Sequence, residues 1–297
     1  MSDLRVIFHV GWPKTATTSM QAELSRFPNL AGKPFGHPGT GRAISTIDAI
    51  VRARTWSPDD LDSLVAASRN DGSLPVLLSD EVLIAMPQRE WFEGLVGPFE
   101  VADRLGRAKG DKQVVFTLRN PRRQLRSTWL HHVREGRTQT YRQFVDRVSR
   151  DRAESRGTFA VAALIGRYSE LFGPDGVAVG FTEDYTTDST SFWQRFGDVL
   201  GIPRMTTFVD SDGARLNATV LGPISYELTV NRALQAYGRL RRRDDIRPLR
   251  RIMTRKVSRR IHASHEGYFL RHSEIEDLLV AELLSDIEHV KKMVRTI

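Results

Sequence analysis

Four short apolar runs alternate along the chain with segments that repeat apolar residues at helical spacing. The runs cover residues 5–10, 74–78, 113–118 and 177–181, and each is followed within two residues by glycine or a charged residue. Runs of this length and composition are typical of parallel strands buried on both faces. Helical periodicity follows in 57–68, 121–133, 141–150, 158–172 and 189–200, and again from 273 onward. The alternation predicts a three-layer α/β fold with a central parallel sheet of about four to five strands, helices on both faces and a helical C-terminal part.

The first strand-to-helix junction favours an anion site. The strand of residues 5–10 ends at Gly11 and Pro13, and a helix is expected from about Thr17, with Thr18 and Gln21 spaced as a capping box. Backbone N–H groups in the first turn of such a helix have no partner within it and lie at the positive end of the helix dipole. Together with Lys14 and several hydroxyls, they would suit a phosphate or sulfate group. The alternative is a structural turn without a ligand.

The residue pattern of this loop differs from that of nucleotide triphosphatases. Their loop reads Gly-x-x-x-x-Gly-Lys-Ser/Thr, which is absent here. Pro-Lys-Thr-Ala-Thr-Thr-Ser resembles instead the 5′-phosphosulfate loop of sulfotransferases, commonly Pro-Lys-x-Gly-Thr-Thr, with alanine in place of the usual glycine. The resemblance implies a P-loop-like fold and the donor 3′-phosphoadenosine 5′-phosphosulfate. It also implies that the donor is held by Lys14, Thr15, Ala16, Thr17, Thr18 and Ser19.

A second anion site is expected where the strand of residues 113–118 ends. Arg119 follows that strand, Pro121 suits a first helical turn, and Ser127 lies two turns into the helix, away from its apolar stripe. Arginine, proline and serine at these spacings are similar to the 3′-phosphate-binding segment of sulfotransferases. The resemblance implies that Arg119 and Ser127 hold the 3′-phosphate. The alternative is that an arginine-rich first turn is only solvated surface.

Three residues are candidates for the base that removes a proton from the acceptor. Glu81 closely follows the strand of residues 74–78, His37 lies in a Gly- and Pro-rich loop, and His9 lies within the first strand. Ligands bind at the carboxyl edge of open parallel sheets, which favours Glu81 narrowly. Ser79 and Asp80 can instead be simple helix caps there, and His9 fits a packed core histidine better than a base.

Two later segments also resemble sulfotransferases. Residues 182–185 form an acidic-aromatic turn after the fourth strand, and Arg215-Leu216-Asn217-Ala218-Thr219 looks like the Arg-x-Asn-x-Ser/Thr segment of bacterial carbohydrate-type members. The alternative for Asn217 and Thr219 is a simple helix cap. The resemblance covers most of residues 4–235. We therefore expect a core of residues 1–235, followed by a basic segment and C-terminal helix over 236–297 that pack on it.

Charge is concentrated in one segment. The chain has 297 residues, a net charge of +8 and no cysteine, which excludes disulfides and thiolate catalysis. Arg239 to Arg260 contains eleven Lys or Arg against two Asp, so one basic segment accounts for the whole excess. It can bind an anionic acceptor, cover the 3′-phosphate, contact an anionic membrane surface, or remain a solvated helix face. No apolar stretch is long enough to span a membrane and no signal sequence precedes the first strand, so a cytoplasmic protein is expected.

Taken together, the sequence predicts an enzyme that moves a sulfuryl group to a hydroxyl or amine of an acceptor, in line with the bridging oxygen. Lys14 would stabilise the leaving group, and no metal is needed. The acceptor is expected to be a carbohydrate or glycolipid, with an anionic one among the candidates, and not nucleic acid. A small-molecule kinase is the first alternative, although the triphosphate loop and a metal-binding aspartate are missing. A non-enzymatic polyanion-binding protein is the second, but it leaves the two anion sites without a purpose.

Overall fold

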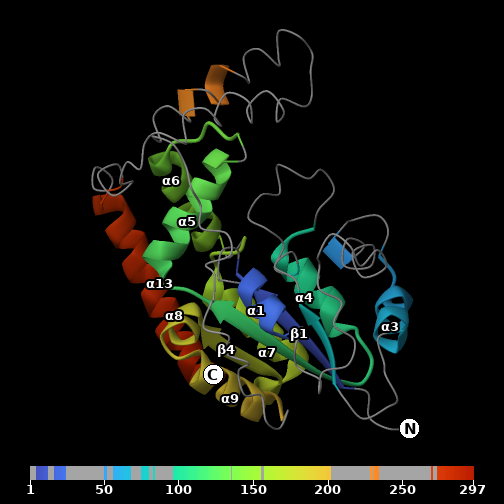
Figure 1. Ribbon diagram of the computed structural model, residues 1–297. Coiled ribbons are helices and arrows are strands. Elements are labelled where there is room, and N and C mark those ends of the chain that lie inside the picture. Colours follow the sequence, from blue (N-terminus) through green and yellow to red (C-terminus); the bar gives the residue numbers. More distant parts are fainter. Residues whose placement is uncertain are drawn as a thin grey trace. The chain divides into compact units, whose positions relative to one another are not determined.

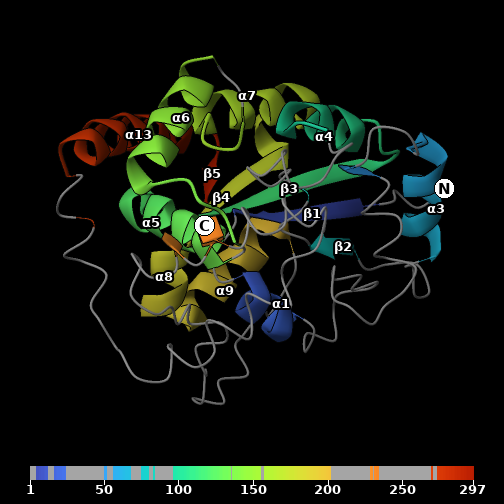
Figure 2. The same ribbon diagram turned by 90° about the horizontal axis from the view of Figure 1, so that it is seen from above.

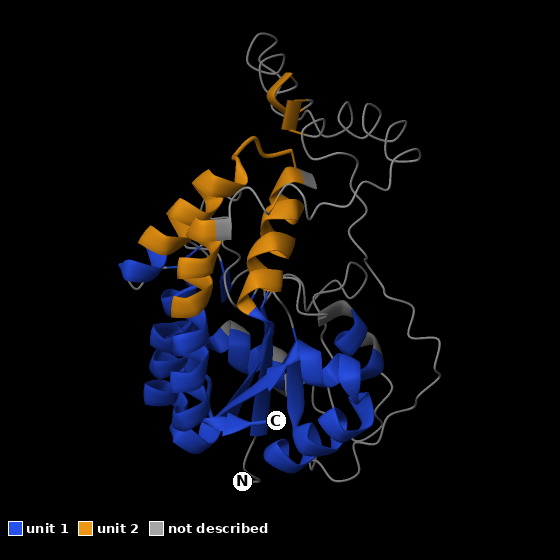
Figure 3. Cartoon of the chain, turned by 90° about the vertical axis from the view of Figure 1, so that its left-hand side faces the viewer, with its two compact units in different colours: residues 1–120, 151–216, 283–297 blue, residues 121–150, 217–282 orange. Residues whose placement is uncertain are grey.

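The computed structural model describes residues 5–12, 17–24, 50–51, 56–67, 75–79, 83, 96–134, 136–154, 157–201, 228–229, 231–233, 269 and 273–297. Clustering of contacts divides the chain into two compact units (Figure 3). Unit 1 contains residues 1–120, 151–216 and 283–297, and unit 2 contains residues 121–150 and 217–282. The expected boundary at residue 235 lies outside the described residues.

Unit 1 is built on a parallel sheet, as the alternation of apolar runs predicted. The described strands are β1 (Arg5–Gly11), β2 (Val76–Ser79), β3 (Asp111–Leu118), β4 (Val177–Phe181) and β5 (Arg295–Thr296). They form one sheet in the order β2-β1-β3-β4-β5, and every neighbouring pair is parallel. The order reverses between β1 and β3, where Val10 lies opposite Phe116. Ligands of open parallel sheets bind beyond the carboxyl ends of the strands at such a point.

Helices cover both faces of this sheet (Figure 2). One face carries α1 (Thr17–Leu24), α8 (Thr182–Thr187) and α9 (Ser189–Leu200), and the other carries α4 (Pro98–Gly106) and α7 (Val161–Phe172). A further helix, α3 (Pro58–Ala67), is labelled in Figure 1 and precedes β2 in the sequence. A short 3-10 turn, η2 (Pro174–Gly176), leads into β4. The expected α/β layering is therefore confirmed.

Side-chain alternation along the strands divides the core between the two faces. Ile7 and Val115 belong to the cluster formed with α1 and α9, whereas Phe8 packs edge-on against Phe172 of α7. Successive residues of a strand point to opposite faces, which explains why neighbours in sequence join different layers. The α1–α9 cluster comprises Ile7, Met20, Leu24, Leu77, Val115, Ala178, Tyr185, Phe192, Trp193, Phe196, Leu200 and Ile297.

Unit 2 is helical in its described part. It contains α5 (Pro121–Arg134), the beginning of α6 (Tyr141–Ala153) and the beginning of α13 (Ser273–Met293). The expected stripe of α5 is buried, and its Trp129 packs edge-on against Tyr141 and Phe269. In α13, Leu278 continues the helical spacing from Ile275, which predicts a place on the apolar face, but it is 73% exposed, so that prediction is wrong. The buried stripe of α13 runs one helical position away, through Leu279, Leu283, Ile287 and Val290.

Candidate active site at the carboxyl edge of the sheet

The first predicted junction has its strand and its helix in the expected places. β1 ends at Gly11, the Trp12 N–H donates to the Thr117 carbonyl at 3.1 Å, and α1 begins at Thr17. The backbone after β1 is thereby attached to β3 at the edge where the strand order reverses. Lys14, Thr15 and Ala16 lie outside the described residues. Of the other donor-loop residues, Thr17 and Thr18 lie in the first turn of α1, and Ser19 follows there, half-buried.

Gln21, which the sequence places in a capping box, reaches a second element of the fold. Its side-chain amide donates to the Ser79 carbonyl at 3.1 Å and to the Ser79 hydroxyl at 3.3 Å. Gln21 therefore joins α1 to the end of β2. Sequence spacing could not reveal this bond, since its two partners are separated by 58 positions.

Arg119 lies directly after β3 and is half-buried. Two contacts from the β4–α8 junction hold the backbone on either side of it. The Thr182 hydroxyl donates to the Leu118 carbonyl at 2.9 Å, and the Asn120 N–H donates to a Glu183 carboxylate oxygen at 3.1 Å. The acidic-aromatic turn noted in the sequence thus has a structural role that sequence reasoning missed, because it fixes the turn that carries Arg119.

Helix α1 is also anchored at its far end. Glu23 accepts a hydrogen bond from the Tyr185 hydroxyl at 2.6 Å and another from the Trp193 indole N–H. Burial and the bond to this carboxylate raise the pKa of Tyr185, which therefore stays a protonated donor at neutral pH. Glu23 was not predicted as a functional residue. Its contacts join α1 to α8 and α9 within the α1–α9 cluster.

Of the three candidate bases, the described residues include His9 alone. The imidazole is fully buried, and its Nδ1 and Nε2 lie 2.8 Å from the Ser79 hydroxyl and 2.7 Å from the Thr117 hydroxyl. Burial lowers the pKa of His9 from 6.5 to about 4, so the ring is neutral at physiological pH. With both nitrogens engaged inside the sheet, His9 is a core residue, as its position within the strand suggested. His37 and Glu81 lie outside the described residues.

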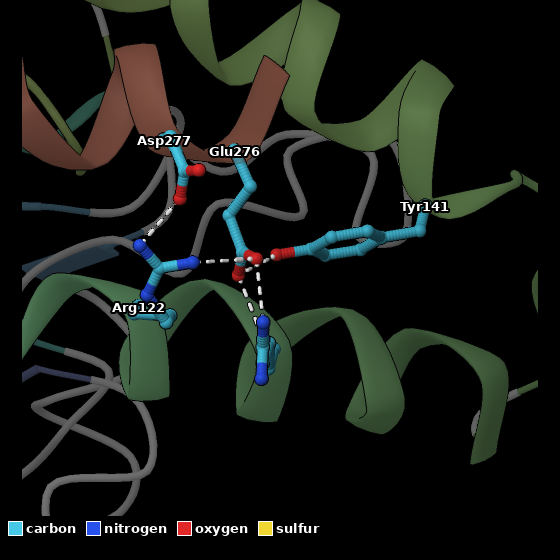
Figure 4. A network of polar contacts seen from close by, with 5 residues as sticks. Arg122, Tyr141, Glu276 and Asp277 are labelled. Atoms are coloured by element: carbon cyan, nitrogen blue, oxygen red, sulfur yellow. Dashed lines mark hydrogen bonds and ion pairs between the residues drawn. The ribbon is translucent and has the colours of Figure 1, made fainter. Parts of the chain in front are cut away.

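Ser127, the other residue expected at the 3′-phosphate, is half-buried on α5 in unit 2. Arg119 belongs to unit 1, so each of these two residues is described within its own unit. The arginines of the same helix have well-defined partners. Figure 4 shows Arg122 of α5 and Tyr141 of α6 directed at Glu276 of α13.

Glu276 accepts four hydrogen bonds although its side chain is fully buried. Arg126 binds it with both arms, Nε to Oε1 at 2.8 Å and Nη2 to Oε2 at 2.7 Å. Arg122 Nη1 lies 3.2 Å from Oε2, and the Tyr141 hydroxyl lies 2.7 Å from Oε1. Arg122 reaches Asp277 as well, at 2.5 Å. The first turns of α5 are therefore not a solvated basic surface, because two guanidinium groups there face two carboxylates.

These contacts also shift proton equilibria. Hydrogen bonding to Glu276 raises the pKa of Arg126, and burial together with the Glu276 bond raises the pKa of Tyr141. Both groups keep their protons throughout the physiological range and act as fixed donors. The network consequently joins three helices of unit 2 through ion pairs and hydrogen bonds to Glu276.

The described residues contain no cluster of three or more His, Asp or Glu side chains placed to hold a metal ion, and none of their helices has the length and hydropathy needed to cross a membrane. The basic segment from Arg239 to Arg260 lies outside the described residues.

No protein-family model matches the chain, and a search of curated proteins finds no relative. Among solved structures, a sulfotransferase from Alicyclobacillus acidocaldarius is 20% identical over 81% of this chain and 97% of its own, with a TM-score of 0.48. Mouse sulfotransferase SULT7A1 complexed with PAP is 15% identical over 68% of this chain and 60% of its own, with a TM-score of 0.37. The sulfotransferase domain of the Synechococcus PCC 7002 olefin synthase is 13% identical over 68% and 74%, with a TM-score of 0.39. Identities and scores this low do not assign a family.

Proposed function

We propose that this protein is a sulfotransferase that uses 3′-phosphoadenosine 5′-phosphosulfate as its donor. The observation that carries the proposal is a pair of neighbouring junctions. β1 leads into the loop with Pro13, Lys14 and the following hydroxyl residues, and β3 leads into Arg119. Because β1 and β3 are parallel neighbours, their carboxyl ends lie at the same edge of the sheet. A donor with phosphate groups at the 5′ and 3′ positions of its ribose would need two cationic positions at one edge of the sheet.

The chemistry proposed for this edge is an in-line displacement. The acceptor hydroxyl or amine attacks sulfur, the bond from sulfur to the bridging oxygen breaks, and negative charge accumulates on the leaving phosphate. Lys14 is proposed to stabilise that charge, while backbone N–H groups and hydroxyls of residues 15–19 hold the phosphosulfate. Arg119 and Ser127 are proposed to bind the 3′-phosphate. The acceptor proton passes to a base, for which Glu81 is favoured narrowly over His37.

The acceptor is proposed to be a carbohydrate or glycolipid hydroxyl, with the basic segment Arg239 to Arg260 favouring an anionic one. A kinase is disfavoured by the missing triphosphate loop, in which a second glycine precedes the lysine. A simple polyanion binder is disfavoured because it gives no role to the loop at β1 or to the arginine after β3.

Titration calorimetry tests the donor assignment. The protein is expected to bind adenosine 3′,5′-bisphosphate at least about tenfold more tightly than AMP, since a charge-assisted contact to the added phosphate contributes about 1.5–3 kcal/mol. Arg119→Ala should abolish most of this preference. Arg167→Ala is the matched control, because Arg167 of α7 pairs with Asp103 of α4 and with Glu170 of its own helix. Equal affinity of the unmutated protein for AMP and the bisphosphate, or tighter binding of ATP, would contradict the proposal.

A further inference from the structure

A chain of buried hydrogen bonds crosses three strands at the edge where the donor is proposed to bind. The His9 ring on β1 lies between the Ser79 hydroxyl on β2 and the Thr117 hydroxyl on β3, at 2.8 and 2.7 Å. All three side chains are fully buried. Gln21 of α1 donates to the Ser79 hydroxyl, and the Thr117 hydroxyl lies 3.9 Å from the Met20 sulfur, also on α1. This series of hydrogen bonds therefore begins and ends on α1, the helix that follows the donor loop.

One arrangement of hydrogens satisfies every member of this chain. Gln21 supplies an N–H to the Ser79 oxygen, so the Ser79 hydroxyl hydrogen is available for His9 Nδ1. His9 then carries its proton on Nε2 and donates it to the Thr117 oxygen, whose own hydrogen faces the Met20 sulfur. In the opposite tautomer the Ser79 oxygen would accept twice, and the described residues offer no acceptor for its hydrogen.

The structure assigns His9 as a positioning residue that holds the end of β2 in register with α1, the helix that follows the donor loop in sequence. The inference rests on the proposed function for its catalytic consequence, although the structural coupling stands apart from it. The loop of residues 13–16 is attached to β1 on one side and to α1 on the other, and Glu81 follows Ser79 by two residues. A displacement of either attachment by about 1 Å is enough to reduce turnover strongly.

Packing alone does not require a histidine at this position. A buried polar side chain costs free energy unless it is bonded, and an apolar residue at position 9 would pack in the same cluster without that cost. His9 already packs edge-on against Phe196 at 6.2 Å, as an apolar ring would. An apolar ring cannot connect Ser79 to Thr117. This connection is what distinguishes a positioning histidine from a residue that only packs.

Two conservative variants separate the two arms of the ring. In His9→Asn the amide oxygen takes the place of Nδ1 and can accept from Ser79, whereas in His9→Gln the amide nitrogen takes the place of Nε2 and can donate to Thr117. His9→Phe removes both bonds at similar volume. Val6→Ala is the control, because Val6 is fully buried on the same strand, three residues before His9, and lacks polar contacts.

Hydrogen exchange and nitrogen NMR test the coupling without any activity. His9→Phe should raise the amide hydrogen exchange rates of residues 17–24 at least about tenfold above those in Val6→Ala. The two variants are compared under conditions in which they have equal thermal stability. His9→Asn should restore slow exchange there, and His9→Gln should not, since the arm toward Gln21 runs through Ser79. Ring nitrogen shifts at neutral pH should show the Nε2–H tautomer. Unchanged exchange in His9→Phe, or the Nδ1–H tautomer, would overturn the inference.

Kinetics test the consequence for the reaction. His9→Phe should lower kcat for sulfuryl transfer about tenfold to a hundredfold while the KM for the donor changes by less than about threefold, because the misplaced groups act on the transition state. His9→Asn should recover most of kcat. A loss in His9→Phe no larger than that in Val6→Ala would overturn the positioning role. If the unmutated protein fails to bind the bisphosphate, the proposed function falls, and the exchange experiment still decides the coupling.

Discussion

Removing the charge of Glu276 should destabilise the protein more than any other single change to the α5–α13 contact. In Glu276→Gln the two guanidinium groups that now face a fully buried carboxylate would face a neutral amide. Deleting one partner of a buried ion pair typically costs about 3–5 kcal/mol, since the remaining charge stays desolvated. The side chains of Arg126 and Arg122 are 24% and 37% exposed, so water relieves part of that cost. We expect the free energy of unfolding to fall by about 3 kcal/mol.

Equilibrium unfolding in urea, followed by circular dichroism, measures this change. Asp277→Asn is the matched control: it also loses a contact to Arg122, but its side chain is 55% exposed, so a loss below about 1 kcal/mol is expected. The control effect should shrink in high salt, whereas the Glu276→Gln effect should persist.

A double-mutant cycle with Arg126→Gln completes the test. The two-armed contact predicts that the double variant is less destabilised than the sum of the single ones, by about 1 kcal/mol or more. Equal small losses of unfolding free energy in Glu276→Gln and Asp277→Asn, or additive effects in the cycle, would refute the view that Glu276 holds α5, α6 and α13 together.

Three further outcomes are expected. Lys14→Ala should lower kcat about 10²–10³-fold with a smaller effect on donor affinity, which steady-state kinetics measure; an effect confined to the donor KM would make Lys14 a binding residue only. The unfolded chain protonates His9 near its ordinary pKa of 6.5 and the folded chain only near 4, so the stability of the protein should fall as pH drops between these values, by up to about 3 kcal/mol. His9→Asn should lack that part of the pH dependence in urea titrations, and an unchanged slope would contradict the assignment. Replacing Arg241, Arg242 and Arg243 with glutamine should raise the acceptor KM at low salt and leave donor affinity unchanged; identical acceptor kinetics would remove the reason to expect an anionic acceptor.

Most of the sheet could be predicted because its strands are local signals. The runs that became β1, β2, β3 and β4 are apolar, β-branched and bounded by breakers, so each could be located without knowledge of its neighbours. β5 was missed because it has only two residues, Arg295–Thr296, and exists by pairing with β4. α4 was missed although its signal was present, in Pro98 at the start and an apolar stripe after it.

The polar contacts could not be predicted, because their partners are far apart in sequence. Glu276 lies 150 positions from Arg126, and nothing in the charge pattern of either helix identifies the other as its partner. Arg126 therefore had the appearance of solvated surface. In the same way, Gln21 fits the spacing of a local cap but bonds to Ser79 on another strand. Spacing rules predict what a residue can do within its own helix, and tertiary packing decides which of its bonds forms.

Leu278 shows that spacing rules have the same limit for apolar residues, because tertiary packing decides which of them are buried. Its spacing from Ile275 is helical, yet 73% of it is exposed, since the neighbouring stripe that begins at Leu279 faces the core. At 100° per residue, Glu276, Leu279, Val280 and Leu283 share one face of α13 and are buried there, whereas Leu278 lies on the opposite face.

The most direct test of the proposed function is transfer itself. The protein is incubated with 3′-phosphoadenosine 5′-phosphosulfate and a panel of glycan and glycolipid acceptors, with a metal chelator present, and both products are measured. The account predicts that a sulfated acceptor and adenosine 3′,5′-bisphosphate form in equal amounts and that Lys14→Ala loses nearly all of this activity. Transfer of phosphate from ATP in place of sulfate, or no release of the bisphosphate with any acceptor, would contradict it.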